Sequence, residues 1–295
     1  MRSVTVLAPA KVNLHLGIYP GRDERGYHRA DSVMVALGLA DRVTVSETPD
    51  SPLRVSMDVD AGVGERDNTA YVAAERLCAA FGRSPEYQVS IEKRVPPQSG
   101  LGGSSSDGAA TILALCDLWG VSPASDAVVG VARSVGADVP FFLNLAPSLL
   151  EGAGDVLRRV FPALGDVPIV LVRPKGGVST ARAYAEFDCD PVNPLDTTGI
   201  INALSGGSVA DVARSLYNNL SGAARRAEGQ IAEVERWLAV QDGVRASMVS
   251  GSGSCVFGIC SSHADAERIA ALAHDEQGLW SCATRVVSCR DEIAN

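Results

Sequence analysis

The sequence lacks any apolar run that approaches the roughly 18 residues of a membrane-spanning helix. Near its start, the apolar stretch Val4–Ala8 is too short for the core of a signal peptide, and Lys11 and Asn13 follow it closely. The seven cysteines form no C-x-x-C pair, and the four histidines show no spacing typical of zinc ligands. Scattered cysteines of this kind are typical of reduced, mostly buried thiols. We therefore expect a soluble, cytoplasmic protein.

The sequence is also poor in positive charge. It contains 26 Lys and Arg residues against 35 Asp and Glu, which gives a formal net charge of -9 at pH 7, and it has no block of basic residues. This balance argues against nucleic acid and anionic membrane surfaces as partners. An acidic protein can still bind an anionic small molecule through local dipoles and a few placed cations. Only three lysines are present: Lys11, Lys93 and Lys175.

A length of 295 residues, with 46% hydrophobic and 21% charged residues, predicts a globular protein of two domains. We expect the boundary between residues 155 and 166, which gives domains of residues 1–160 and 161–295. Strand patterns occur at residues 2–19, 42–46, 53–59, 88–92, 167–172, 256–260 and 284–288. Helical patterns occur at residues 68–81, 107–120, 125–135, 208–219, 223–240 and 263–274. Helices and strands mix without regular alternation, so the expected fold class is α+β.

The strongest chemical signal is the Gly/Ser run from Gly100 to Ser106. Consecutive small residues let backbone N–H groups approach a polyphosphate closely, and a helix that follows adds its unpaired N–H groups and positive dipole end. Serine hydroxyls can donate to phosphate oxygens or bind magnesium. The alternative is a flexible linker, but a well-patterned helix follows the run immediately. We therefore predict a phosphate-binding loop.

The common nucleotide-binding loops do not match this run. A Walker A loop requires Gly-Lys-Ser/Thr, and none of the three lysines follows a glycine. A Rossmann fingerprint would need glycine at position 105, where Ser105 stands. The protein-kinase motifs His-Arg-Asp and Asp-Phe-Gly are absent. A phosphate loop of another type is expected.

Other candidate residues are ambiguous when each is taken alone. Asp138 lies in the turn-like Gly136–Pro140, between a helix and an expected apolar strand, where a carboxylate is more often a turn residue than a catalytic one. For Asp107, at the start of the expected helix, we favour a capping role. Lys11 shares a strand face with Asn13 and His15 and would alone be a solvated residue. Tyr27-His28 fits a base-stacking pair and the start of a strand equally well.

Three segments together resemble the motifs of the GHMP kinase superfamily, which includes galactokinase, homoserine kinase and mevalonate kinase. They are Pro9–Leu14, Pro96–Ser106 leading into Asp107–Ala110, and Ser250–Phe257. Within the superfamily the closest likeness is to the diphosphocytidyl-methylerythritol kinase family. The features that carry it are Ala-Lys-Val-Asn-Leu-His-Leu, Gly26-Tyr27-His28, Gly136–Pro140, and Glu151-Gly152 with Gly154. The likeness runs from residue 9 to about residue 260.

The resemblance implies a two-domain α+β fold, with a nucleotide-binding N-terminal domain, a ferredoxin-like C-terminal domain and the active site in the cleft between them. It implies transfer of the γ-phosphoryl of ATP to the 2-hydroxyl of 4-diphosphocytidyl-2-C-methylerythritol, in non-mevalonate isoprenoid synthesis, with Mg²⁺ on the ATP. The alternatives are a GHMP kinase that acts on homoserine or a mevalonate derivative, and a non-catalytic nucleotide-binding protein. The oligomeric state is expected to be a monomer or a homodimer.

The resemblance also implies roles for residues. Asp138 would be the general base on the hydroxyl, and Lys11 would hold Asp138 ionised and stabilise charge on the transferring phosphoryl. The ATP-binding loop would comprise Pro96, Pro97, Gln98, Ser99, Gly100, Leu101, Gly102, Gly103, Ser104, Ser105 and Ser106. Magnesium would have no protein ligand beyond the hydroxyl of Ser105 or Ser106.

For the acceptor, Tyr27 and His28 would stack on and hydrogen-bond the cytosine, and Tyr184 would close the sandwich from the second domain. Asn13 and Thr180 would contact the substrate near its reacting end.

The loop departs from the family at Ser104, where glycine is more common, and at Gln98-Ser99, which replace small residues. A Cβ at residue 104 would crowd the phosphates if φ were positive there. Lys175–Gly177 replaces a proline-containing turn before Thr180.

Overall fold

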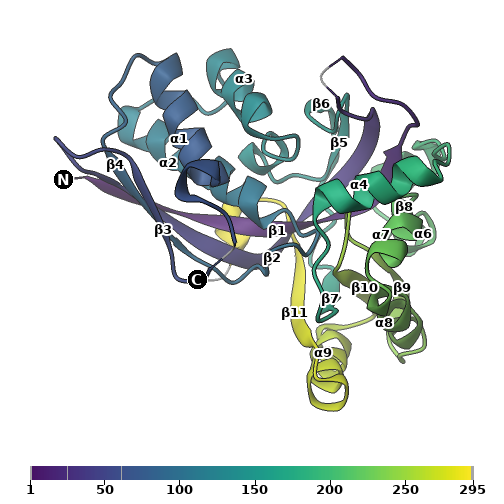
Figure 1. Cartoon of the computed structure of the whole chain (residues 1–295). Coiled ribbons are helices and arrows are strands. Elements are labelled where there is room, and N and C mark those ends of the chain that lie inside the picture. The colour runs from purple at the N-terminus through teal and green to yellow at the C-terminus, as the bar shows by residue number, and fades with distance from the viewer. Residues whose placement is uncertain (1, 25, 61, 294–295) are drawn as a thin grey trace.

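The computed structural model of the chain describes residues 2–24, 26–60 and 62–293. Its first half is built on two long strands, β1 (Ser3–Ile18) and β2 (Ala30–Glu47), which pair antiparallel along their whole length (Figure 1). The C-terminal part of β2 pairs with β4 (Tyr87–Glu92), which runs parallel to β3 (Arg54–Met57). The N-terminal part of β2 pairs with β5 (Ser148–Glu151), and β5 pairs with β6 (Val156–Val160). The strand predicted over residues 2–19 is confirmed.

Three helices pack against this sheet: α1 (Thr69–Ala80), α2 (Gly103–Trp119) and α3 (Asp126–Val135) (Figure 1). The predicted stop of α2 is confirmed, because Gly120 follows the helix in the left-handed conformation, with φ 67°. The helix begins four residues before the predicted start at Asp107. Its first turn, Gly103–Ser106, consists of glycine and serine, which carry no apolar periodicity and so gave no helical signal.

The second half contributes four antiparallel strands in the order β11-β7-β10-β9. Its strands are β7 (Pro168–Arg173), β9 (Val244–Val249), β10 (Val256–Cys260) and β11 (Trp280–Val287). The helices α8 (Gln230–Ala239) and α9 (His263–Gln277) complete a βαββαβ arrangement, and the strand order is that of a ferredoxin-like fold. The predicted α+β class and the two-part fold are confirmed.

The segment between β7 and α8 contains elements that the sequence patterns did not resolve. It forms α4 (Thr180–Cys189), α5 (Thr198–Gly206), α6 (Val209–Arg214), β8 (Tyr217–Asn218) and α7 (Ser221–Ala227). The helix predicted over 208–219 is therefore too long, because β8 pairs with β1 and the Asn218 side chain donates to two backbone carbonyls. The helix predicted over 223–240 is interrupted at Gly229, a poor helix former.

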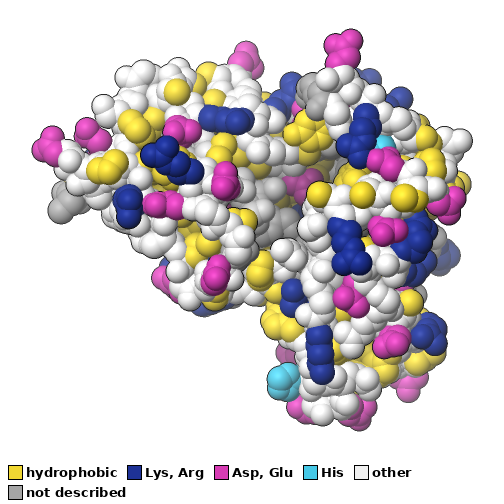
Figure 2. Space-filling model, viewed as in Figure 1, with side chains coloured by type: hydrophobic (Ala, Val, Ile, Leu, Met, Phe, Trp, Pro, Cys, Tyr) yellow, Lys and Arg dark blue, Asp and Glu magenta, His cyan; other side chains and the backbone are white. Residues whose placement is uncertain are grey.

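The two halves are joined by more than the chain connection. The last strand, β11, pairs with β7 and then with β2, through Val286↔Leu37 and Val287↔Ala36. Figure 2 shows the molecule hollowed between the two halves. All seven cysteines are free thiols, and four of them are buried, as predicted. Within the described residues, no helix has both the length and the apolar character needed to span a bilayer.

Candidate active site

The hollow contains a cavity of about 570 Å³ that is lined by both halves of the molecule. We call one part the loop end; it is lined by residues of the Gly/Ser loop together with Asn68 and Lys93. We call the other part the tyrosine end; it is lined by Tyr27, Thr180 and Tyr184. Lys11, Asn13 and Asp138 also line the cavity. The structure thus brings together segments that lie far apart in the sequence.

The backbone of the Gly/Ser loop is oriented by a series of hydrogen bonds. Five consecutive carbonyls, from residue 97 to residue 101, each accept a hydrogen bond from outside the loop. These bonds are Arg173 Nη2 to Pro97 O (3.2 Å), Val178 N to Gln98 O (3.2 Å), Cys255 N to Ser99 O (2.9 Å), Ser250 Oγ to Gly100 O (3.0 Å) and Lys11 N to Leu101 O (2.9 Å). Four of the five donors come from the second half of the chain. The third predicted motif, around Ser250, therefore packs directly on the loop.

Most N–H groups of the same loop have no protein partner in the part of the chain that the structure describes. From residue 98 to residue 105, no backbone N–H donates to any acceptor in the described ranges 2–24, 26–60 and 62–293. The first N–H groups of α2 belong to this set, as at the start of any helix. Unpaired amides at a helix N-terminus form a binding site for an anion such as phosphate. Pro96–Gly100 and Gly102–Ser105 line the cavity, whereas Leu101 and Ser106 are buried beneath it.

The Cβ of Ser104 does not crowd the phosphates in the way that a positive φ would cause. Ser104 lies in the first turn of α2 and is not among the residues with positive φ. The left-handed positions of the loop are Gln98, Gly100 and Gly102, with φ of 53°, 75° and 73°. Gly100 has no room for a side chain, since a Cβ there would lie 2.0 Å from the carbonyl oxygen of Ser250.

A series of polar contacts leads from β1 to Asp138, which lines the cavity. Lys11 and Asn13 lie on one face of β1, and the Lys11 ammonium donates to Asn13 Oδ1 at 2.7 Å. Asn13 Nδ2 in turn donates to Ser32 Oγ at 2.8 Å, which fixes the orientation of the amide. Lys11 Nζ lies 3.5 Å from Asp138 Oδ2. Lys11 is buried, while the Asp138 side chain is 32% exposed and faces the cavity.

Asp138 is held in a turn after α3. The apolar residues that follow form a short 3-10 helix, Phe141–Leu143, and not the expected strand. Phe141 and Phe142 are fully buried, so this segment anchors the turn in the core. A carboxylate on a turn of this kind is fixed from below and open to the cavity above.

The tyrosine end is formed by side chains of the β1–β2 connection and of α4. Tyr27 is 56% exposed, and Tyr184 is half-buried. Burial, together with the charge of Asp138, raises the pKa of the Tyr184 hydroxyl, so that it stays protonated at neutral pH. Thr180 begins α4, and its hydroxyl lies 3.3 Å from that of Ser252.

His28 occupies a different position from the other predicted binding residues. Its side chain is buried and does not line the cavity. The ring lies behind Tyr184, with 5.4 Å between ring centroids, and its Nδ1 lies 3.0 Å from the carbonyl oxygen of Tyr19. His28 Nε2 lies 3.0 Å from Asp188 Oδ1. In this structure His28 contacts the tyrosine end through Tyr184.

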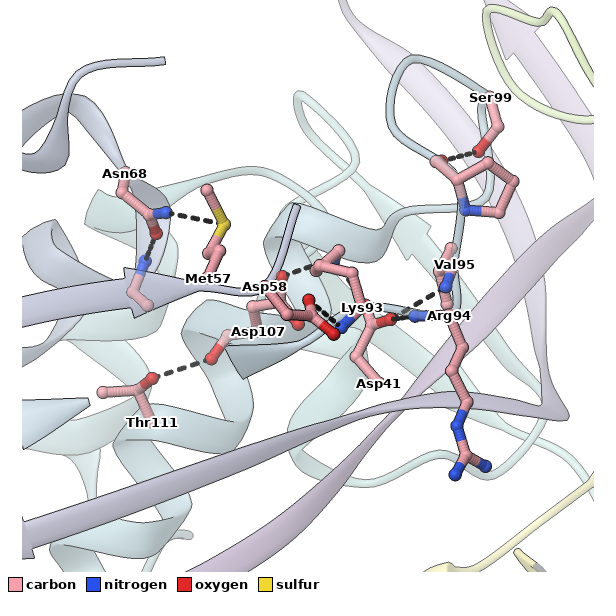
Figure 3. Close-up of polar contacts among 12 residues, drawn as sticks. Asp41, Met57, Asp58, Asn68, Lys93, Arg94, Val95, Ser99, Asp107 and Thr111 are labelled. Carbon is pink, nitrogen blue, oxygen red and sulfur yellow. Dashed lines mark hydrogen bonds and ion pairs between the residues drawn. The ribbon is translucent and has the colours of Figure 1, made fainter. Parts of the chain in front are cut away.

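Sequence reasoning missed a buried ion cluster beside the loop. Figure 3 shows Asp41, Lys93 and Asp107 converging, with Lys93 Nζ at 2.5 Å from Asp41 Oδ2 and 2.7 Å from Asp107 Oδ2. The prediction that Asp107 caps a helix is wrong, because Asp107 is the fifth residue of α2 and its carboxylate binds Lys93. The rarity of lysine was the one signal in the sequence that could have drawn attention to Lys93.

The cluster has unusual electrostatics because it is almost completely buried. Burial alone would lower the pKa of the Lys93 ammonium. The charges of Asp107 and Asp41 outweigh burial, so the pKa of Lys93 is raised. Burial, aided by the Asp41 charge, raises the pKa of Asp107 to about 7, against the opposing effect of Lys93.

Comparisons with known proteins agree with this geometry. The sequence models "GHMP kinases N terminal domain" and "GHMP kinases C terminal" match residues 68–144 and 200–274. The chain is 37% identical over 270 residues to a 4-diphosphocytidyl-2-C-methyl-D-erythritol kinase of Desulfitobacterium hafniense, covering 91% of each chain. It is 35% identical over 277 residues to the enzyme of that name from Nocardia farcinica, covering 91% of this chain and 88% of that one.

Two solved structures are similar to the chain over almost its whole length. A crystal structure of 4-(cytidine 5'-diphospho)-2C-methyl-D-erythritol kinase matches with a TM-score of 0.76 and 33% identity, covering 96% of this chain and 99% of the other. Homoserine kinase from Cytophaga hutchinsonii matches with a TM-score of 0.78 at 18% identity, covering 98% of this chain and 96% of that one. At that identity the second likeness concerns the fold alone.

Proposed function

The chain belongs to the GHMP kinase superfamily and, within it, to the 4-diphosphocytidyl-2-C-methyl-D-erythritol kinase family, and from this premise we propose its reaction. It transfers the γ-phosphoryl group of ATP to the 2-hydroxyl of 4-diphosphocytidyl-2-C-methyl-D-erythritol, and the products are the 2-phosphate and ADP. The observation that carries this proposal is that the Lys11–Asp138 pair lines the same cavity as the loop and the two tyrosines, with Lys11 N bonded to Leu101 O of the loop and the charge of Asp138 acting on Tyr184.

In this reaction Asp138 accepts the proton of the 2-hydroxyl. The hydroxyl oxygen forms a bond to the γ-phosphorus, and the bond between that phosphorus and the β,γ-bridging oxygen breaks. Lys11 faces both the carboxylate and the transferring group, where its charge offsets the negative charge that spreads over the phosphoryl oxygens. The unpaired amides of residues 98–105 bind the remaining phosphates. Catalysis therefore depends mainly on position and electrostatics.

The residues near the loop fit a magnesium ion that is carried by the nucleotide. Ser106 Oγ is buried with no protein partner, and Ser105 lines the cavity. No group of three or more His, Cys, Asp or Glu side chains in the described residues could hold a metal by itself. Mg²⁺ would thus be held by the ATP phosphates and the hydroxyl of Ser105 or Ser106. When bound, it neutralises charge on the phosphates.

At the tyrosine end we propose that Tyr27 and Tyr184 stack on the two faces of the cytosine. His28 supports Tyr184 from behind and acts on the base through that contact. Thr180 and Asn13 contact the acceptor near the hydroxyl. We place the division of the chain near residue 160; cytoplasmic location and a monomeric or homodimeric state stay predictions of the sequence.

The acceptor can be tested by measuring ADP release with each of three compounds: the diphosphocytidyl substrate, homoserine and mevalonate. We expect turnover with the first alone, because the two tyrosines at the tyrosine end suit a base and a small aliphatic acid offers nothing to stack on them. Robust turnover of homoserine or mevalonate would contradict the proposal. ATP binding without turnover of any of the three would favour a non-catalytic role.

A further inference from the structure

The phosphate-binding loop is attached at both ends to the buried cluster of Asp41, Lys93 and Asp107. Lys93 is the residue that directly follows β4, and Asp107 lies in the second turn of α2. Asp41 belongs to β2. Along the chain, the loop of residues 96–106 lies between Lys93 and Asp107, which bond to each other. Three elements of the first half therefore meet where the loop begins and ends.

At the first attachment, the Asp41 carboxylate fixes the backbone that leaves β4. Its Oδ1 accepts hydrogen bonds from the N–H groups of Arg94 and Val95, at 2.5 and 2.8 Å. Its Oδ2 accepts from the Lys93 ammonium. Asp41 is completely buried, so no water competes for these bonds. The carboxylate thus determines where residues 94 and 95 lie before the loop begins.

At the second attachment, Lys93 links the same carboxylate to α2. Its ammonium donates to Asp107 Oδ2 at 2.7 Å. The start of the helix packs tightly on this ammonium, since a Cβ added at Gly103 would lie 3.3 Å from Lys93 Nζ and 3.1 Å from Val95 Cγ1. The position of the first turn of α2, which supplies several of the unpaired amides, therefore depends on the cluster.

The charges of the cluster do not suit a direct phosphate ligand. Two carboxylates surround one ammonium, so the cluster has no surplus positive charge to offer an anion. Lys93 and Asp107 line the cavity, but Asp41 does not and is wholly buried. An effect of Asp41 on nucleotide binding must consequently be transmitted through Lys93 or through the backbone of the loop.

We propose that Asp41, Lys93 and Asp107 are positioning residues that clamp both ends of the phosphate-binding loop and hold its amides in the arrangement that binds ATP. This proposal rests on the proposed function in one respect, namely that ATP is the ligand of the loop. It does not depend on which acceptor is phosphorylated. Its role is separate from that of the Lys11–Asp138 pair, which faces the reacting atoms.

The test uses Asp41→Asn, which keeps the size of the side chain but removes the charge that Lys93 requires. The control is Glu235→Gln, which removes the α8 carboxylate that forms a bidentate ion pair with Arg225 of α7, away from the cavity. Binding of a non-hydrolysable ATP analogue with Mg²⁺ is measured by calorimetry on the full chain without acceptor. Amide hydrogen exchange over residues 98–105 in the complex with the ATP analogue and urea unfolding are measured on the same samples.

For Asp41→Asn we expect the Kd of the ATP analogue to rise at least about 10-fold, and exchange over residues 98–105 in the saturated complex to accelerate. In full assays the KM for ATP should rise while the KM for the acceptor stays within about 2-fold. Glu235→Gln should leave both the ATP affinity and the exchange of residues 98–105 unchanged. If Asp41→Asn does not fold, Asp107→Asn, which leaves the bonds of Asp41 to Lys93, Arg94 and Val95 in place, should show the same change to a smaller degree.

Unchanged ATP affinity and loop exchange in a folded Asp41→Asn protein would overturn the clamp. A loss of affinity in Asp107→Asn alone, with Asp41→Asn unaffected, would also overturn it and would make Asp107 a direct ligand. A protein that binds the ATP analogue but does not phosphorylate the diphosphocytidyl substrate would contradict the proposed function and leave the clamp intact.

Discussion

The loop end and the tyrosine end of the cavity use different parts of the chain for recognition. The loop end presents backbone N–H groups, whose direction is set by five carbonyls bonded to donors outside the loop. The tyrosine end presents side chains, and one of them, Tyr27, is 56% exposed. A backbone site tolerates little change, because every amide depends on its neighbours. A side-chain site can be altered one residue at a time. We therefore expect changes at the loop end to be the more severe.

The largest effect is expected for Gly100→Ala. A Cβ at residue 100 would lie 2.0 Å from the Ser250 carbonyl oxygen, so the loop and the third motif would have to move apart. The affinity for ATP should fall at least about 100-fold, because several amides lose their positions together. The measurement is calorimetric binding of an ATP analogue.

Gly120→Ala is the matched control for that change. Gly120 is also left-handed, with φ 67°, but a Cβ there meets nothing within 4 Å. It should lower the free energy of unfolding by about 1–2 kcal/mol through backbone strain and leave ATP binding unchanged. If the two variants bound ATP equally well, the tight loop geometry would not be needed for the nucleotide.

An intermediate effect is expected for Tyr184→Ala. Loss of one stacking partner for a base costs about 1–3 kcal/mol, so the KM for the diphosphocytidyl substrate should rise on the order of 10-fold or more. Tyr184→Phe keeps the ring and should be close to the wild type. Tyr27→Ala should have a smaller effect, because Tyr27 is exposed before the substrate binds. The KM for ATP should not change in any of these variants. A changed KM for ATP would show that the two ends of the cavity are not independent.

The smallest effect is expected when the pH is lowered until Asp188 is protonated. A hydrogen bond from Arg22, helped by the nearby His28, holds the pKa of Asp188 below its usual value. The ionised carboxylate therefore stabilises the contact between α4 and the β1–β2 connection at pH values above about 4, and this is lost as the pH falls through the lowered pKa. Hydrogen exchange in α4 should thus accelerate in acid before exchange in α2.

Asp188→Asn should remove that difference between α4 and α2. Asp275→Asn, which changes an exposed acid on α9, is its control and should leave the difference unchanged. Simultaneous loss of protection in both helices of the wild-type protein would contradict this prediction.

The contrast between the two ends also determines what the sequence could predict. The loop is contiguous, so its small residues and the helix after it identified a phosphate site, and the strands β1, β7 and β10 followed from their apolar patterns. The segment that holds α4 and α5 has little periodicity, and both helices were missed.

The side-chain contacts were not predictable from spacing. Asp41, Lys93 and Asp107 come from three elements, and only the folded chain brings their charges within hydrogen-bond distance. For the same reason Asp107 was assigned a local capping role that it does not have. Tyr27, Thr180 and Tyr184 do line one cavity, as the family resemblance implied, but the burial of His28 behind Tyr184 depends on how α4 packs.

The proposed transfer depends most directly on the Lys11–Asp138 pair, and one measurement tests it: steady-state kinetics of Asp138→Asn with ATP and the diphosphocytidyl substrate. Loss of the general base should lower kcat by at least about 100-fold. The KM for ATP should stay within a few-fold, because the loop amides that bind the phosphates are untouched. Turnover at the wild-type rate in a folded Asp138→Asn protein would contradict the role of Asp138 and, with it, the proposed mechanism.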